Sequence, residues 1–261
     1  MVTQNEKERF DICCRRVLTS QHERQGIGTL GERTLHLILK HYFESDATMH
    51  EQKVGRYVAD IKNGDDITEI QTRSFGSMRA KLTEFAKVHK VNVVYPIAAT
   101  KHLSWLDPQN GELTDRRKSP KRGMPWDILY ELYALRPIMP LENVRFTLVF
   151  MDMDEFRLLD GWSRDKKRGG SRYERIPTAL VDVMTLENTA DFTALVPPSL
   201  GERFTAAEFA RAAKMTPRTA GYAIRTLTTL GVIEHTDTEG RAYIYTRCKI
   251  QIRKDNKNET V

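Results

Sequence analysis

Apolar positions recur with two different periods along the first hundred residues. Helical spacing predicts three helices, over residues 5–18, 31–44 and 77–90. Alternating spacing predicts two strands, over residues 53–61 and 67–73. Between these strands, Asn63-Gly64 is a strong hairpin signal. The run 91–98 is almost entirely apolar, as is typical of a strand buried on both faces of a sheet. This order of elements predicts a mixed α/β core.

The rest of the chain alternates between polar loops and short regular elements. We expect a loop over 106–125, a short helix over 126–135, a strand over 144–151 and a second loop over 161–175. Pro197-Pro198 is typical of a linker. The predicted organisation is a first domain over 1–196, with a core at about 26–105 extended by 106–196. A second domain over 200–250 and a frayed tail over 253–261 follow it.

Composition limits the cellular locations and the partners that we expect for the protein. No run of 18 apolar residues occurs and the N-terminus lacks a signal-peptide h-region, so we expect no membrane span, no secretion and a cytoplasmic location. The cysteines, Cys13, Cys14 and Cys248, form neither a disulfide framework nor a metal-ligand spacing. A net charge of +6 permits a nucleic-acid partner.

The register of the first hairpin decides which polar side chains share a face. A loop of two residues (63–64) or four (62–65) pairs residues whose numbers sum to 127. Asp60, Glu69 and Gln71 then project to one side, with Asp60 and Glu69 diagonal neighbours about 7–8 Å apart. One hard cation could bridge two such carboxylates through oxygen ligands. A three-residue loop would remove this arrangement. On the helix before the hairpin, Glu32 lies on the apolar stripe, an unusual place for a carboxylate.

The order Glu32, Asp60, short turn, Glu69-x-Gln71 and helix resembles the PD-(D/E)xK nuclease superfamily over residues 26–105. The resemblance implies a restriction-endonuclease-like mixed sheet flanked by helices. It also implies that Asp60 and Glu69 hold Mg²⁺ (or Mn²⁺), that Glu32 is an accessory carboxylate and that Gln71 occupies the position of the catalytic lysine. Phosphodiester hydrolysis suits such a site, because Mg²⁺ prefers oxygen ligands and polarises the phosphate.

Two departures from that pattern concern Ala59 and Gln71. Ala59 stands where the family name has proline, and Gln71 leaves a positive charge to be supplied by Arg73 or, as the better candidate, by Lys81. The segment also shows fewer strands than usual, so one strand is expected to be short or fused near 50–54. The alternative interpretation is an ordinary surface hairpin.

The last fifty residues carry strong capping signals. Thr205 with Glu208 forms a capping box for a helix over 204–213, and Thr216 with Pro217 starts a second helix. The second helix is expected to bury one face and to expose Arg218, Thr219, Tyr222, Arg225 and Thr226. A hairpin turning at Thr238-Glu239-Gly240 follows.

Two helices at this spacing, followed by a hairpin, resemble a winged helix-turn-helix domain. The resemblance implies DNA reading by Arg218, Thr219, Tyr222 and Arg225, with Arg241 on the wing. A protein-interaction module is the alternative.

Other polar groups carry weaker signals. His36 and His41 are five residues apart on one helix, so surface or packing roles are expected rather than a shared metal. Asp152 and Asp154 are assigned to a strand end. The basic loops 116–122 and 164–175 either follow a phosphate backbone or are solvated.

Two functions follow from these patterns. The first is a Mg²⁺-dependent DNA endonuclease that binds DNA partly through a winged helix. The alternative is a catalytically inactive, nuclease-like DNA-binding regulator or interaction protein. DNA is the expected partner and a membrane is not. A homodimer is suggested only by analogy with nucleases that cut both strands.

Overall fold

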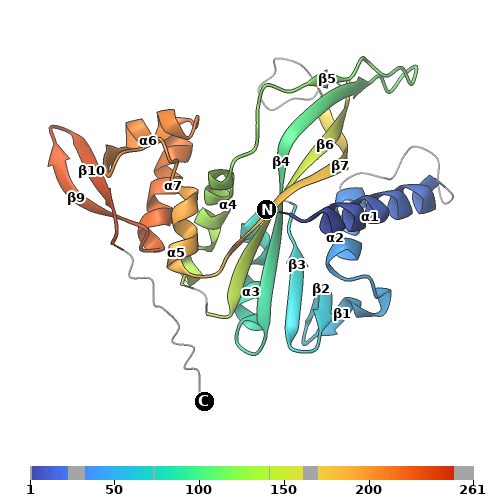
Figure 1. Ribbon diagram of the computed structural model, residues 1–261, viewed down its shortest axis with the longest axis horizontal. Coiled ribbons are helices and arrows are strands. Elements are labelled where there is room, and N and C mark those ends of the chain that lie inside the picture. Colours follow the sequence, from blue (N-terminus) through green and yellow to red (C-terminus); the bar gives the residue numbers. More distant parts are fainter. Residues whose placement is uncertain (1, 23–32, 73, 141, 161–169, 250–261) are drawn as a thin grey trace.

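The computed structural model of the protein describes residues 2–22, 33–72, 74–140, 142–160 and 170–249. They form a mixed sheet with helices on both faces and a smaller helical unit with its own three-stranded sheet (Figure 1). Among these residues no helix is long and apolar enough to cross a membrane.

The α-helices are α1 (Gln4–His22), α2 (Arg33–Phe43), α3 (Arg79–Phe85), α4 (Leu129–Leu132), α5 (Thr189–Phe192), α6 (Ala206–Ala212) and α7 (Pro217–Thr229). The 3₁₀-helices are η1 (Ala47–Met49), η2 (Phe75–Met78), η3 (Pro125–Ile128), η4 (Tyr133–Ile138) and η5 (Thr193–Leu195). The strands are β1 (His50–Val54), β2 (Tyr57–Asn63), β3 (Asp66–Ile70), β4 (Lys90–Leu106), β5 (Arg117–Lys118), β6 (Val144–Leu158), β7 (Ser171–Leu186), β8 (Arg203–Thr205), β9 (Ile233–Glu239) and β10 (Ala242–Arg247).

The main sheet has the order β1-β2-β3-β4-β6-β7, with β5 pairing to β4. The pairs β3–β4 and β4–β6 are parallel and the others are antiparallel. Parallel neighbours need a crossover, and η2 with α3 supplies it between β3 and β4. The mixed α/β sheet flanked by helices is therefore confirmed.

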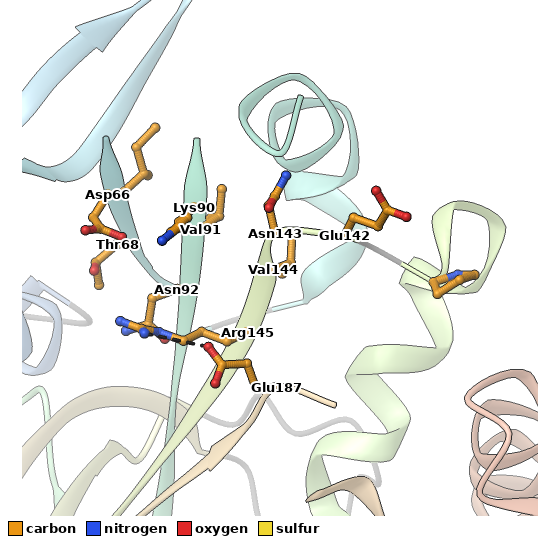
Figure 2. Close-up of a pocket in the computed structure, with 12 residues that line it drawn as sticks. Asp66, Thr68, Lys90, Val91, Asn92, Glu142, Asn143, Val144, Arg145 and Glu187 are labelled. Atoms are coloured by element: carbon orange, nitrogen blue, oxygen red, sulfur yellow. Dashed lines mark ion pairs between the residues drawn. The ribbon is translucent and has the colours of Figure 1, made fainter. Parts of the chain in front are cut away.

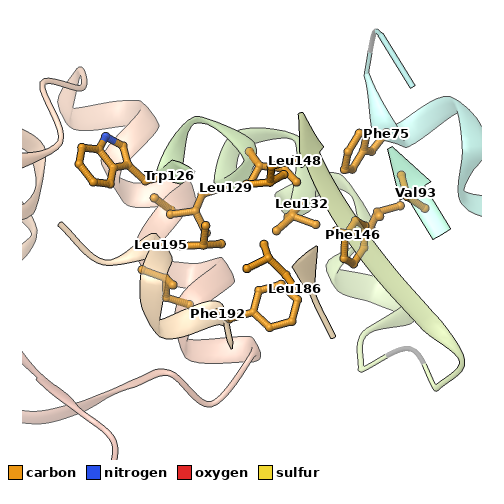
Figure 3. Close-up of a cluster of buried hydrophobic side chains, with 14 of the residues drawn as sticks. Phe75, Val93, Trp126, Leu129, Leu132, Phe146, Leu148, Leu186, Phe192 and Leu195 are labelled. Carbon is orange, nitrogen blue, oxygen red and sulfur yellow. The ribbon is translucent and has the colours of Figure 1, made fainter. Parts of the chain in front are cut away.

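Two apolar clusters cover the two faces of this sheet. One joins α1 and α2 to side chains such as Ile61, Ile70 and Val94. The other lies on the opposite face and continues from Phe75 and Phe146, through Leu129 and Leu132 of α4, into the C-terminal unit (Figure 3). The indole N–H of Trp126 donates to the Ala213 carbonyl at 3.2 Å across this boundary.

Several predicted elements needed correction. The expected strand 53–61 is two strands, because Gly55, with a φ of +58°, turns the chain between β1 and β2. β1 is the short strand expected near 50–54. The helix expected over 77–90 is η2 followed by α3, and most of the helix expected over 126–135 is 3₁₀. The expected loop 106–125 contains β5.

The lengths of β6 and β7, at one end of the main sheet, exceed what the sequence predicts. β6 continues seven residues beyond its predicted end at 151, and β7 begins within the loop expected over 161–175. Sequence patterning missed β7 because Pro177 lies inside it, and proline lowers a strand prediction. The register with β6 is irregular beside Pro177, so the missing N–H falls at a bulge-like position.

The predicted register of the first hairpin was wrong by two residues. The turn is formed by Gly64 and Asp65, and the paired residues, such as Ile61 with Thr68, sum to 129 rather than 127. Gly64 has a φ of +56°, which suits glycine in this turn. Because the shift is even, every side chain keeps its predicted face.

The C-terminal unit follows its predicted caps. Thr205 and Glu208 form the capping box of α6, and the hydroxyl of Thr216 caps α7 with Pro217 at its first position. β8, β10 and β9 form the three-stranded sheet, and the β9–β10 hairpin turns at Gly240-Arg241, one residue later than expected. Thr226 was predicted to be exposed, but it is buried against α4, where its hydroxyl lies 3.4 Å from the Leu129 carbonyl oxygen.

Candidate functional site: two carboxylates where β2 and β3 part

Strands β2 and β3 separate at Asp60 and Glu69. Their last ladder pair is Ile61 with Thr68, and continuing that register sets Asp60 opposite Glu69 rather than diagonal to it. The amide of Ile70 donates to Asp60 Oδ2 at 2.7 Å, and the amide of Asp60 donates to Glu69 Oε1 at 3.2 Å. The two carboxylates thus satisfy backbone donors that the parting strands leave unpaired. We call this arrangement the carboxylate fork.

A histidine from α2 completes one side of the carboxylate fork. His36 Nε2 lies 3.0 Å from Asp60 Oδ2, and both side chains are partly buried. His36 thus has a packing role, as expected, and its contact with a predicted site residue is the part that the sequence did not indicate. Sequence spacing gives no signal for this contact, because α2 and β2 are brought together only by the packing of α2 on the sheet.

A lysine from α3 completes the other side. Lys81 Nζ lies 2.5 Å from Glu69 Oε2, and the Lys81 side chain is only 20% exposed. The same ammonium lies 5.6 Å from the centre of the Phe85 ring. Lys81, the preferred source of positive charge in place of the missing lysine after Glu69, therefore has its amine at that carboxylate.

Gln71, at the position of the family's lysine, is turned toward the chain that follows it. Its amide Nε2 donates to the Ser74 carbonyl at 3.1 Å and lies 3.3 Å from Ser77 Oγ. Its backbone N–H donates to the Val94 carbonyl of β4. The described contacts of the Gln71 amide therefore stabilise the start of η2.

The surroundings of Asp60 and Glu69 shift their pKa values in opposite directions. Burial raises the pKa of Asp60, but the hydrogen bond and charge of His36 and the Ile70 amide outweigh burial and bring the pKa below its usual value. Burial, reinforced by the negative charge of Asp60, raises the pKa of Glu69 to about 7 despite Lys81. Two neighbouring carboxyl groups with divergent proton affinities are frequent at functional sites.

The donor set of the carboxylate fork suits a hard divalent cation. Mg²⁺ commonly binds through one or two carboxylates and keeps several water ligands. Asp60 and Glu69 offer two carboxylates that are only 17% and 7% exposed, and each carboxylate oxygen has more than one acceptor direction. Within the described ranges, no group of three or more His, Cys, Asp or Glu side chains has a metal-binding arrangement.

Two predicted site residues, Glu32 and Arg73, lie outside the described residues. Close to where α2 begins, Thr34 donates to Glu174 of β7 at 2.5 Å. Burial raises the pKa of Glu174 despite this hydrogen bond. Glu174 is therefore a further buried carboxylate near α2 that the sequence did not single out.

The predicted DNA-reading face of α7 is partly covered. Arg218 and Arg225 are exposed, as is Arg241 at the tip of the β9–β10 hairpin, whereas Thr219 is half-buried. Tyr222 packs on Tyr133 of η4, with ring centres 4.4 Å apart. Thr219 also helps to form the cap of α7, because its hydroxyl lies 2.9 Å from that of Thr216. The accessible part of this face is therefore arginine-rich.

An open pocket of about 600 Å³ lies at the opposite ends of the strands (Figure 2). It is lined at the starts of β3, β4 and β6 by residues that include two cations, Lys90 and Arg145, and three acids, Asp66, Glu142 and Glu187. Arg145 and Glu187 are 3.8 Å apart across it. With acids and bases both present and the carboxylate fork at the other end of β3, this pocket does not contribute to the site.

Comparison with known proteins places the chain in a family but gives no activity. The chain belongs to a family described as a domain of unknown function (DUF8091), which matches residues 33–187. An uncharacterized protein of Treponema pallidum (strain Nichols) is 28% identical over 180 residues, covering 67% of this chain and 69% of that protein. No solved structure matches the chain.

Proposed function

We propose that this member of the DUF8091 family is a metal-dependent nuclease that hydrolyses phosphodiester bonds in DNA. The observation that carries the proposal is the position of Lys81. At the parting of two strands, the buried Glu69 and the partly buried Asp60 have an ammonium 2.5 Å from Glu69, in place of the lysine that the sequence lacks after Glu69. Carboxylates that can hold a metal, together with one cation, suit phosphodiester hydrolysis, because both the metal and the cation stabilise negative charge on the phosphate.

In the proposed site, Asp60 and Glu69 would hold Mg²⁺ or Mn²⁺, which polarises the scissile phosphate when bound. The His36 and Ile70 hydrogen bonds keep Asp60 ionised and fix its orientation. Lys81 is positioned to neutralise the charge that develops on the phosphate and to orient the attacking water. The attacking water forms a bond to phosphorus and gives up a proton, the bond to one ester oxygen breaks, and the leaving oxygen takes up a proton.

The proposal includes a winged helix-turn-helix assignment for the C-terminal unit. Supporting it are the order β8, α6, α7, β9, β10, the two capped helices and the exposed Arg218, Arg225 and Arg241. In such a domain α7 would enter the major groove and the β9–β10 hairpin would contact the backbone. The packing of Tyr222 on Tyr133 limits which part of α7 could do so.

A second candidate function is a DNA-binding regulator that has lost catalysis. The observation in its favour is Gln71, whose amide is held by Ser74 and Ser77 instead of extending toward the carboxylates. In that case, the ion pair of Lys81 with Glu69 would be purely structural.

The test is incubation of the purified protein with supercoiled plasmid and linear duplex in Mg²⁺, Mn²⁺ or EDTA, beside Asp60→Ala. We expect metal-dependent cutting that disappears in Asp60→Ala. Binding without cutting under every metal would favour the regulator. Cutting that survives in Asp60→Ala would reject the carboxylate fork as the active site.

A further inference from the structure

Two segments of the chain, β3 and residues 117–123, form hydrogen bonds one after the other along the same edge of β4. β6 occupies the other edge over nearly the whole length of β4. β3 pairs with β4 over Lys90–Val94 and then ends. Farther along, the chain segment 117–123 takes over the vacated edge, with Gly123 donating to the Ala98 carbonyl and Lys118 pairing with His102. This segment therefore continues the line of β3 beyond the carboxylate fork.

The segment on that edge is strongly basic. Residues 116–122 contain five cations and no acid: Arg116, Arg117, Lys118, Lys121 and Arg122. All five side chains are exposed. We call this stretch the basic edge.

The basic edge is held firmly on β4. The Ser119 amide donates to the Lys101 carbonyl at 2.8 Å and the Gly123 amide to the Ala98 carbonyl at 2.8 Å. Gly123 permits this approach, because a Cβ there would lie 2.6 Å from the Ala98 carbonyl oxygen. Arg117 stacks on Trp105, with its guanidinium carbon 4.8 Å from the ring centre. The backbone that carries these cations is therefore held against β4 by the fold.

Two acids of β6 near the basic edge, Asp154 and Glu155, are already paired with other cations or with Arg116. Arg116 pairs with Asp154 at 2.9 Å, and Glu155 is paired with Lys101 and Arg157. Within the described part of the chain, no carboxylate forms an ion pair with Lys118, Lys121 or Arg122. Three exposed cations within five residues, none of them ion-paired to another described residue, suit a ligand that carries several anions.

The number of β4 residues between the carboxylate fork and the basic edge gives the distance between these two features. Val94, beside the carboxylate fork, and Ala98, where the basic edge begins, are four residues apart, and His102 is eight residues from Val94. At about 3.3 Å per strand residue these separations are about 13 and 26 Å. Along duplex DNA they correspond to about four to eight base pairs.

We propose that the basic edge is the docking surface for the phosphate backbone of the duplex DNA on which the carboxylate fork acts. Lys118, Lys121 and Arg122 contact phosphates about four to eight base pairs to one side of the bond at Asp60 and Glu69. The inference rests on the proposed nuclease function, and it names where the substrate lies. It also makes the basic edge, rather than the C-terminal unit alone, responsible for positioning DNA.

The test measures binding of a fluorescent 30-base-pair duplex by anisotropy, in EDTA so that no cutting occurs, at several salt concentrations. The variant is K118Q/K121Q/R122Q. The matched control is K53Q/K87Q/K90Q, which removes the same charge from exposed lysines away from the basic edge. We expect the first variant to lose roughly tenfold or more in affinity and to reduce the salt slope by about 2 to 3, and the control to change much less.

A second variant separates position from charge. G123A keeps every cation but pushes the segment away from Ala98, so we expect weaker binding with an unchanged net charge. Equal losses in the K118Q and K53Q triple variants, or no loss in either, would overturn the proposal.

Failure of the nuclease proposal would look different. If the wild-type protein never cuts DNA but K118Q/K121Q/R122Q loses DNA binding, the role of the basic edge in binding DNA is supported and only the catalytic role is rejected. If K118Q/K121Q/R122Q cuts DNA with wild-type affinity and rate, only the role of the basic edge as the DNA docking surface is rejected.

Discussion

The charged side chains of the carboxylate fork are largely buried, whereas those on α7 are exposed to solvent. Glu69 is only 5% exposed and lies between Asp60 and Lys81, while Arg218 and Arg225 are exposed. A buried charge is costly unless it is paired, so removal of one partner has a large effect. Exposed charges are screened by solvent and salt and contribute little to folding. Substitutions at the fork should therefore affect chemistry and pH dependence, and those on α7 mainly salt-dependent binding.

The largest expected effect comes from Asp60→Asn. The amide keeps an acceptor for the Ile70 N–H but removes the negative charge, so we expect single-turnover cleavage of duplex DNA in Mg²⁺ to fall by about a thousandfold or more. Asp66→Asn is the matched control, since Asp66 is an exposed acid of the same hairpin. Equal rates for the two variants would show that the fork is not the reaction centre.

The next effect distinguishes Lys81 from Gln71. Lys81→Met should lower the cleavage rate by about two to three orders of magnitude, because it removes the cation near the reacting phosphate. Gln71→Ala, which only frees Ser74 and Ser77, should change the rate by less than about tenfold. Single-turnover rates at saturating protein measure both. The reverse ranking would assign the catalytic role to Gln71 and leave Lys81 a structural ion pair.

The raised pKa of Glu69 predicts a pH-dependent stability. Its pKa is about 7 in the folded protein against an ordinary 4.5, so the folded state holds the proton more tightly. As pH rises from about 4.5 to about 7, the unfolded chain loses this proton first, and the folded protein loses stability. Glu69→Gln lacks this loss.

The free energy of unfolding of Glu69→Gln, measured by urea denaturation at pH 4.5 and pH 8, tests this shift. Relative to the wild type, the variant should gain on the order of 2 to 3 kcal/mol between the two pH values. Parallel pH profiles of the two proteins would contradict the raised pKa.

The smallest effect is expected in the C-terminal unit. Thr216→Ala removes the side-chain cap of α7 and should lower the free energy of unfolding by about 1 kcal/mol. Thr216→Ser keeps the hydroxyl and serves as the control. Neither substitution should alter the single-turnover cleavage rate at saturating protein. A loss of rate in Thr216→Ala alone would couple α7 to the chemistry and weaken the contrast between the two regions.

Local signals in the sequence were enough for the capped helices α6 and α7 and for the buried strand β4. The caps at Thr205 and Thr216 are short-range hydrogen bonds between residues only three positions apart in the sequence. Likewise, the apolar run 91–98 indicated a buried strand, and β4 contains it. The shared face of Asp60 and Glu69 was also predictable, because an error of two residues in register preserves side-chain parity.

The sequence offered Lys81 as a candidate cation for this site, but the tertiary structure decided which groups meet the carboxylates. His36 reaches Asp60 from α2 and Lys81 reaches Glu69 from α3, on helices that precede and follow the hairpin in the sequence. The same holds for the basic edge, which lies beside the fork because β3 ends at Ile70 and leaves an edge of β4 for residues 117–123. Periodicity reports which way a side chain faces within its own element. It does not report which elements pack together, and packing determines the partners, the burial and therefore the pKa values of the site.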